Sequence, residues 1–162
     1  MMIKIGDTLP DTQVPARVGG EMGSLSMGTL YADTTAILLG VPAAFSPTCS
    51  NQHIPGFIAQ RESLREKGVG AIICVSVNDL FVMEGWQQAL SADALTFFPD
   101  AEGTFTRAIG MEIDIGRLGL GRRSTRYTLV AKNGIVSFLQ IEEDPSQCSV
   151  SDVSQVMTTL AA

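Results

Sequence analysis

Cys49 is the residue to which the sequence most clearly assigns chemistry, and it follows a loop that contains Pro42 and Ser46. An apolar run at residues 36–41 precedes this loop, and a helix-like amphipathic segment extends over residues 49–67. We therefore expect the sulfur near the start of a helix, where free backbone N–H groups and the helix dipole favour a thiolate over a thiol. Because the thiolate is the nucleophilic form of cysteine, this region predicts nucleophilic or redox chemistry in a solvent-exposed, rigid hollow.

The residues around Cys49 have the types needed to hold and stabilise a reactive sulfur. Pro42 and Pro47 fix backbone angles in the loop. The hydroxyl of Ser46, three residues before the sulfur, could donate a hydrogen bond to the thiolate and accept one from a substrate. The positive charge has to come from elsewhere, and residues 122–127 contain three arginines. We expect Arg126 to point inward and the other two to lie on a solvated strand edge.

The other potentially reactive side chains admit alternative interpretations. His53 follows Cys49 by four residues, on the same face of a regular helix. The pair raises the hypothesis of a Cys-His acyl-transfer hydrolase, although this spacing makes the geometry between imidazole and sulfur awkward. We expect His53 to be a structural hydrogen-bonding or pocket-edge residue, because a single Cys-x-x-x-His pair supplies only two metal ligands. A redox sensor that passes its oxidation to a partner protein would need the same chemistry at Cys49, and it stays an alternative to an enzyme.

Composition and charge narrow the class of protein. The chain has 162 residues, of which 45% are hydrophobic and 17% charged, so we expect one domain, residues 1–162, with a substantial core. The formal charge of −6 argues against binding to nucleic acid or to an anionic membrane surface. The start of the sequence lacks a secretory signal pattern, and no apolar run approaches the ~20 residues that span a bilayer. A cytoplasmic location is the default expectation.

The three cysteines, Cys49, Cys74 and Cys148, are too few and too widely spaced for a disulfide-framed module. The sequence contains no Cys-x-x-Cys pair, which excludes the dithiol motif of thioredoxins and a zinc ribbon. Cys74 lies within the apolar run 69–77 and is expected to act as a small buried hydrophobic residue.

Strand-like and helix-like segments alternate along the chain. The strands are expected at residues 34–41, 69–77, 95–98, 127–131 and 135–141, with a shorter one at 11–18 and a short element at 24–30. The helices are expected at residues 49–67 with a kink at Pro55, then at 79–90, 104–109 and 151–160. Asn133-Gly134 predicts a tight hairpin. This order favours an α/β fold, a thioredoxin-like three-layer sandwich with a central mixed sheet, with the Cys49 loop at a strand's carboxyl end.

The glycine-rich stretch at residues 116–121 looks superficially like a phosphate-binding fingerprint. It has no convincing strand before it and no helix after it, so we reject that interpretation.

Several motifs together resemble those of a known family. Pro42-x-x-x-Ser46-x-x-Cys49 matches the P-x-x-x-(T/S)-x-x-C signature of peroxiredoxins. The longer run to His53-x-Pro55-Gly56-Phe57 resembles the type II, or peroxiredoxin-5-like, subfamily of the AhpC/TSA-redoxin superfamily. Further similar segments follow in the same order, at residues 75–86, 99–100, 123–127 and 133–136. The resemblance therefore extends over nearly the whole chain.

The resemblance implies a thiol peroxidase that reduces hydrogen peroxide and alkyl hydroperoxides without a bound cofactor or metal. Carried over residue by residue, Cys49 is the peroxidatic cysteine, Pro42 shields it, Ser46 orients the peroxide and Arg126 is the positive group beside the sulfur. Attack on the peroxide converts the thiolate of Cys49 to a sulfenic acid, which a second thiol must then reduce.

The identity of that second thiol stays open in the sequence. Cys148 lies near the place where some animal members carry an intramolecular resolving cysteine. Many bacterial and plant members instead use external glutathione and glutaredoxin, and thioredoxin is a further candidate. Type II members also pair as homodimers through the face near the catalytic loop, so Phe45 and part of residues 81–83 are expected either in the core or against a partner chain.

Overall fold

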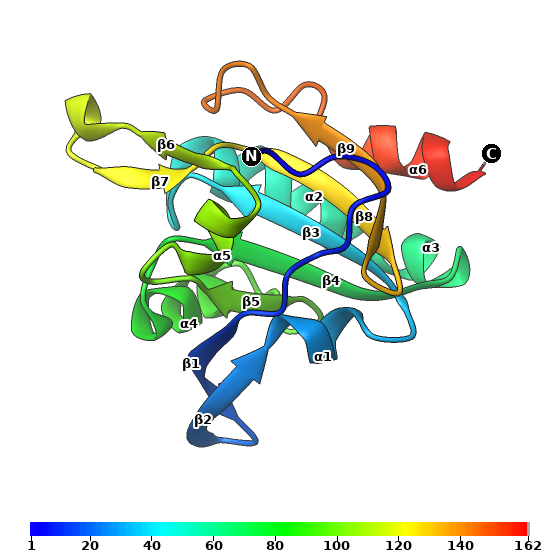
Figure 1. The fold of residues 1–162 in the computed structure, drawn as a ribbon, viewed down its shortest axis with the longest axis horizontal. Helices are drawn as coiled ribbons and strands as arrows, with labels where there is room; N and C mark the ends of the chain where they lie inside the picture. The colour runs from blue at the N-terminus through cyan, green and yellow to red at the C-terminus, as the bar shows by residue number, and fades with distance from the viewer. Residues whose placement is uncertain (162) are drawn as a thin grey trace.

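The computed structural model describes residues 1–161 and has a five-stranded sheet at its centre (Figure 1). The strands are β1 (Gln13–Val18), β2 (Glu21–Ser26), β3 (Thr35–Val41), β4 (Val69–Ser76), β5 (Thr96–Pro99), β6 (Glu112–Asp114), β7 (Arg122–Ser124), β8 (Tyr127–Lys132) and β9 (Ile135–Ile141). The α-helices are α1 (Met27–Tyr31), α2 (Ile54–Ala59), α3 (Arg61–Glu66), α4 (Leu80–Ala89), α5 (Thr104–Ala108) and α6 (Val153–Ala161). A π-helical turn, η1 (Cys49–His53), precedes α2, and a 3-10 turn, η2 (Gly116–Leu118), lies between β6 and β7.

The central sheet has the strand order β5-β4-β3-β8-β9. Strands β3, β4 and β5 run parallel, while β8 pairs antiparallel with both β3 and β9. The predicted hairpin is confirmed, because Lys132 pairs with Ile135 across Asn133 and Gly134, both of which have positive φ angles. The mixed sheet places the carboxyl end of β3 next to the start of β8, and this junction is where Cys49 and Arg126 meet.

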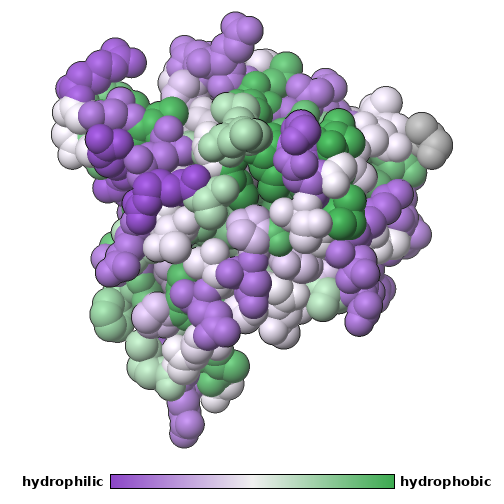
Figure 2. Space-filling view, in the orientation of Figure 1, coloured by the Kyte–Doolittle hydropathy of each residue, from purple (hydrophilic) through white to green (hydrophobic). Residues whose placement is uncertain are grey.

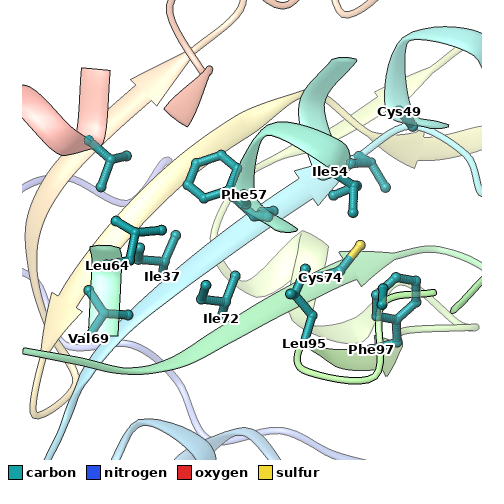
Figure 3. Packing of buried hydrophobic residues seen from close by; sticks show 14 of the residues in the cluster. Ile37, Cys49, Ile54, Phe57, Leu64, Val69, Ile72, Cys74, Leu95 and Phe97 are labelled. Carbon is teal, nitrogen blue, oxygen red and sulfur yellow. The ribbon is translucent and has the colours of Figure 1, made fainter. Parts of the chain in front are cut away.

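The apolar runs of β3 and β4 form the middle of the sheet because both of its faces are covered. Along β3, Ile37 and Leu39 belong to one hydrophobic cluster, and Leu38, between them, belongs to the cluster on the opposite face. Cys74 of β4 lies in the same cluster as Ile37, as Figure 3 shows together with residues of α2 and β5. Both sides of the central strands therefore pack into a core.

The two faces of the sheet are covered by different elements. Side chains of α2, α3, α4 and α6 pack on the face that contains Cys74, including Phe57, Leu64, Trp86 and Val156. The N-terminal segment, α1 and α5 pack on the other face, including Leu9, Met27 and Phe105. In Figure 1 the N-terminal segment crosses the front of the sheet, and α2 lies behind it. The predicted three-layer, thioredoxin-like α/β arrangement is confirmed.

The helix predicted at residues 49–67 with a kink at Pro55 is divided into three parts. The π-helical turn η1 ends where the Ile54 N–H donates to the Cys49 carbonyl, five residues back, and α2 begins there with Pro55 in its first turn. Proline has no N–H, and its ring excludes the carbonyl of the preceding turn, so the regular pattern cannot run through it. A second break at Gln60, which the sequence pattern did not indicate, separates α2 from α3.

Two projecting hairpins complete the molecule. The β1–β2 hairpin was expected only as a strand and a loosely defined element, while β6–β7 was not predicted at all. Figure 2 shows hydrophilic side chains over much of the β6–β7 hairpin. The glycine-rich residues 116–121 form its tip, where β6 precedes them, contrary to expectation, and β7 follows them in place of a helix. Within residues 1–161, no helix has the length and apolar character that crossing a bilayer requires.

Candidate active site

Cys49 lies at the start of the helix that follows β3, after a short loop. Pro42 follows the last residue of β3 and is buried, and the loop then turns through Phe45, which has a left-handed backbone with φ 64°. The carbonyl of Ser46 accepts the first helical hydrogen bond, from Ser50 N–H at 2.9 Å. Cys49 therefore lies in the first turn of a helix, as predicted, where backbone amides favour negative charge.

Arg126 reaches the sulfur from the residue before β8. Its Nη2 donates to Cys49 Sγ at 3.0 Å, although the two residues are 77 positions apart in the sequence. The arginine side chain is 1% exposed, so water screens this contact very little. A guanidinium that donates to sulfur in a dry site stabilises the thiolate, and the expectation that Arg126 points inward is confirmed.

Two expectations about the immediate surroundings of the sulfur are wrong. The Ser46 hydroxyl donates to the carbonyl of Ala43 at 2.8 Å, within its own turn, and not to Cys49. Cys49 itself is fully buried, although its position in the sequence predicts an exposed thiol. It is buried because the helix η1–α2 packs its inner side on the sheet, so the sulfur belongs to the hydrophobic cluster beneath.

His53 lies behind Arg126, not beside the sulfur. Its Nδ1 is 3.1 Å from Arg126 Nη1, and its Nε2 is 2.9 Å from Thr128 Oγ1. Burial, followed by the charge of Arg126, lowers the pKa of His53 to about 3, although Glu142 opposes this shift. The expectation of a structural hydrogen-bonding residue is confirmed. Since both ring nitrogens face these partners, the geometry does not support a Cys-His hydrolase.

The loop between β9 and α6 also contacts the site, in addition to the Cys49 helix and Arg126. The carbonyl of Pro145 accepts from Arg126 Nε at 3.0 Å, and the carbonyl of Ser146 accepts from the Thr48 hydroxyl at 2.7 Å. The loop is held by Glu142, whose carboxylate accepts hydrogen bonds from the backbone or hydroxyl groups of Ser149, Val150 and Ser151. No local motif in the sequence marks the role of this loop.

The carboxylate of Glu142 is kept ionised by these contacts. Its burial alone would raise the pKa, but the hydrogen bonds from Ser151 and Ser149 outweigh that effect and lower the pKa to about 2. Glu142 N–H also donates to the carbonyl of Arg126 at 2.9 Å. The same residue therefore joins the loop to the backbone of Arg126, directly before β8.

The two other cysteines differ from Cys49 and from each other. Cys74 is fully buried in β4, as predicted, and burial raises the pKa of its thiol well above the ordinary value. Cys148 is half-buried in the loop held by Glu142, and its sulfur is 3.7 Å from the hydroxyl of Ser151. Burial raises the pKa of Cys148 as well.

The remaining arginines are not alike. Arg122 is exposed and pairs with Glu112 at 2.9 Å, as expected for a solvated strand edge. Arg123 was expected to be similar, but it is half-buried and donates to the carbonyls of Leu120 and Val77, each at 2.8 Å. Arg123 is buried in this way because the β6–β7 hairpin places it against Val77, in the loop after β4.

Among residues 1–161, no group of three or more His, Cys, Asp or Glu side chains is arranged to hold a metal ion. The chemistry that the site itself supports is that of a buried, arginine-paired sulfur nucleophile.

Comparison with known proteins identifies the class to which this site belongs. Residues 4–157 match the family model described as Redoxin. Peroxiredoxin-2C of Oryza sativa subsp. japonica is 43% identical over 160 residues, which cover 98% of each chain. Peroxiredoxin-2E, a chloroplastic protein of Arabidopsis thaliana, is 41% identical over 148 residues, which cover 87% of this chain and 62% of that protein. Among solved structures, reduced Prx3 of Vibrio vulnificus in complex with hydrogen peroxide has a TM-score of 0.92 at 38% identity and covers 99% of this chain and 97% of that one.

With this fold, this pairing of sulfur and guanidinium and these relatives, the chain belongs to the redoxin family and, within it, to the type II peroxiredoxins. It is a thiol peroxidase, an enzyme whose substrate is a peroxide and whose reductant is a thiol. The resemblance inferred from the sequence is confirmed.

Proposed function

We propose that this thiol peroxidase reduces hydrogen peroxide and alkyl hydroperoxides through Cys49. The main support is the 3.0 Å contact between Arg126 Nη2 and Cys49 Sγ in a site without exposed surface. A cationic donor at this position both favours the thiolate and can stabilise negative charge that develops on a peroxide beside it. The similarity to Prx3 of Vibrio vulnificus, solved in complex with hydrogen peroxide, supports that substrate in particular.

The proposed reaction is a displacement at one peroxide oxygen. The sulfur of Cys49 donates an electron pair to the terminal oxygen, a sulfur–oxygen bond forms and the oxygen–oxygen bond breaks. Cys49 becomes a sulfenic acid, oxidised by two electrons, while the leaving alkoxide or hydroxide takes a proton and departs as alcohol or water. Arg126 donates to the oxygens as the charge moves onto the leaving group.

Pro42 and Ser46 have proposed roles in shaping access to the sulfur. Pro42 is buried directly after β3 and shields the thiolate from bulk water. The Ser46 hydroxyl donates to Ala43 and keeps its own lone pairs free to accept from a peroxide O–H. Because Cys49 is fully buried, a peroxide reaches the sulfur only when side chains of the loop at residues 42–48 move apart.

The test is to mix the fully reduced protein with stoichiometric hydrogen peroxide, count free thiols over time and locate the added oxygen by mass spectrometry. We expect rapid loss of one thiol and an oxygen atom on Cys49. The Cys49→Ser variant should leave the peroxide unconsumed, while Cys74→Ala, which removes the buried sulfur of β4, should react like the unmodified protein. Persistence of all three thiols would refute the proposal.

We further propose that an external thiol, glutathione with glutaredoxin or thioredoxin, reduces the sulfenic acid. The Cys148 thiol is half-buried and has a raised pKa, both of which disfavour it as the attacking group. It remains the second candidate because its loop contacts Arg126 through Pro145 and Thr48 through Ser146. Steady-state turnover of Cys148→Ser with each reductant separates the two routes: unchanged turnover supports the external thiol, and loss of turnover together with loss of a Cys49–Cys148 disulfide supports Cys148.

A homodimer is the proposed assembly, with the aromatic surface near Cys49 as its interface. Phe45 and Phe81 are 55% and 70% exposed, which is unusual for phenylalanine. Phe45 lies over α4, with its ring centre 6.4 Å from that of Trp86, and Phe81 is in the first turn of the same helix. Light scattering should give a dimer mass for the unmodified protein and a monomer mass for Phe81→Arg. A dimer mass for Phe81→Arg would contradict this interface.

A further inference from the structure

Arg126 uses all three of its guanidinium nitrogens inside the protein. Nη2 donates to Cys49 Sγ at 3.0 Å, Nε to the Pro145 carbonyl at 3.0 Å and Nη1 to Nδ1 of His53 at 3.1 Å. One contact to the sulfur would leave the planar group free to rotate, but contacts through all three of its nitrogens fix its orientation. The position of the charge beside Cys49 therefore depends on His53 as well as on the loop.

The hydrogen bonds around His53 determine where its proton lies. Arginine can only donate, so Nδ1 of His53 must be an acceptor without hydrogen. The hydrogen is then on Nε2, which donates to the hydroxyl of Thr128 at 2.9 Å, and Thr128 in turn donates to the carbonyl of Ser151 at 2.5 Å. We call His53, Thr128 and the Ser151 carbonyl the polar chain behind Arg126. Each member donates to the next, so the chain allows only one tautomer of His53.

The surroundings of His53 keep this tautomer neutral. The side chain is fully buried, its ring meets Phe57 edge-on with the centres 5.9 Å apart, and the charged groups acting on it are Arg126 and Glu142. Together these surroundings lower its pKa to about 3. A protonated ring would turn an N–H toward the guanidinium and repel it from the sulfur.

We propose that His53 is a positioning residue: its unprotonated Nδ1 holds the guanidinium of Arg126 against the sulfur of Cys49, and Thr128 fixes the tautomer that makes this possible. The inference rests on the proposed function, because it assigns His53 a part in oxidation of Cys49 by peroxide. His53 acts through Arg126 and touches neither the sulfur nor the substrate. No bond to His53 forms or breaks, and its proton stays on Nε2.

Two variants of His53 separate the acceptor from the donor. In His53→Asn the amide oxygen can take the place of Nδ1 and still accept from Arg126, while the contact to Thr128 is lost. In His53→Gln the amide nitrogen can take the place of Nε2 and still donate to Thr128, while the acceptor for Arg126 is lost. Because hydrogen bonds to charged groups are the stronger ones, we expect oxidation of Cys49 by hydrogen peroxide to be at least about tenfold slower in His53→Gln than in His53→Asn.

The measurements are the stopped-flow rate of Cys49 oxidation, the ultraviolet absorbance of the thiolate at neutral pH and the urea midpoint of each variant. A purely structural role would shift the urea midpoints and leave the rates of the folded variants equal. Equal rates for His53→Asn and His53→Gln therefore overturn the proposal, as does unchanged thiolate absorbance in His53→Gln. Failure of the unmodified protein to consume peroxide would refute the proposed function instead.

Thr128 provides a second test that does not require a change at His53. Thr128→Val removes the hydroxyl with little change of shape, so His53 is free to adopt the other tautomer and lose its acceptor. Thr128→Ser keeps the hydroxyl and should restore the rate that Thr128→Val loses. We expect a several-fold difference between these two variants, and equal rates would contradict the role of the tautomer even where His53→Gln does not fold.

Discussion

Cys49 and Cys74 are equally buried and yet have very different surroundings. Both have no exposed surface and belong to the same hydrophobic cluster, one in the first turn of a helix and the other in the middle of β4 (Figure 3). Cys74 lies between Leu39 of β3 and Phe97 of β5, and burial raises the pKa of its thiol. Cys49 has the guanidinium of Arg126 at 3.0 Å.

Burial is common to both sulfurs, so the arrangement of charge around them is the physical difference on which the proposed role of Cys49 rests. Desolvation disfavours a thiolate at either position. Only a donor that is already oriented and already desolvated offsets this cost, because no solvent needs to reorganise when charge moves during the reaction. The polar network around Arg126 is therefore the feature that separates a nucleophile from a core residue.

The largest expected effect comes from removing that donor. Arg126→Gln should place Cys49 in surroundings like those of Cys74 and slow its oxidation by peroxide about 10²–10³-fold, as loss of one oriented donor does elsewhere. Arg126→Lys keeps the charge but cannot make all three contacts of the guanidinium, and we expect an intermediate rate. Stopped-flow oxidation of the folded variants measures both.

Arg123→Gln is the matched control for this prediction. It removes a half-buried guanidinium whose hydrogen bonds go to the carbonyls of Val77 and Leu120. Stability should fall by about 1 kcal/mol for each hydrogen bond lost, while the peroxide rate stays the same. Equal slowing in the Arg123 and Arg126 variants would contradict a specific role for Arg126.

Acid should destabilise the surroundings of Cys49 in a defined pH range. The pKa of His53 falls from 6.5 to about 3 on folding, so below pH 6.5 the unfolded chain binds the proton more readily and stability decreases as the pH falls. At roughly pH 5 the loss is about 2 kcal/mol, at about 1.4 kcal/mol for each pH unit below 6.5. Urea unfolding at a series of pH values measures it.

Glu142 extends this loss to lower pH. Its folded-state pKa of about 2 lies below the ordinary 4.5, so its contribution is complete above pH 4.5 and disappears as the pH falls toward 2. His53→Gln should flatten the curve between pH 6.5 and 4.5, and Glu142→Gln should flatten it below 4.5. An unfolding free energy that does not change between pH 6.5 and 4.5 in the unmodified protein would be incompatible with a neutral, buried His53.

A substitution of Ser46, in the loop before Cys49, is expected to have a smaller effect on the oxidation rate. Its hydroxyl donates to the Ala43 carbonyl and, in the proposed reaction, accepts from the peroxide, so Ser46→Ala should slow the oxidation of Cys49 by about tenfold, the equivalent of one ordinary hydrogen bond. Ser46→Thr keeps the hydroxyl and should react faster than Ser46→Ala. Identical rates for the two variants would show that the hydroxyl has no part in the reaction.

The sequence was sufficient to predict the scaffold of this site because the relevant signals are local. The apolar runs of β3 and β4, the Asn133-Gly134 turn and the prolines around Cys49 each restrict the backbone without help from distant residues. The short β6–β7 hairpin and the break at Gln60 carry no comparable signal. Their positions depend on packing against the rest of the chain.

Orientation of the polar side chains was harder to predict because it depends on partners far along the chain. Arg126 was assigned an inward position, but its contact with Pro145 and the fixed tautomer of His53 require β8, η1 and the loop before α6 to be in place. The hydroxyl of Ser46 donates to the Ala43 carbonyl instead of the sulfur. The sequence motifs therefore indicated which residues lie around Cys49, but the tertiary contacts determine which of their atoms form hydrogen bonds.

The smallest expected effect concerns Tyr127. It is next to Arg126 in the chain, but its side chain lacks the hydrogen bonds that the Arg126 side chain makes. The Tyr127 hydroxyl is fully buried and has no hydrogen-bond partner among residues 1–161, and burial raises the pKa of its phenol. The ring lies over Gly40 of β3, where a Cβ would come within 1.9 Å of it, so its place in the core depends on shape. Tyr127→Phe keeps that shape and removes an unsatisfied polar group, and we expect a gain in stability of about 1 kcal/mol with an unchanged peroxide rate. A clear loss of stability would mean that the hydroxyl has a hydrogen-bond partner in solution. Tyr127 would then be a satisfied buried polar group, like Arg126, and the difference between the two residues would not hold.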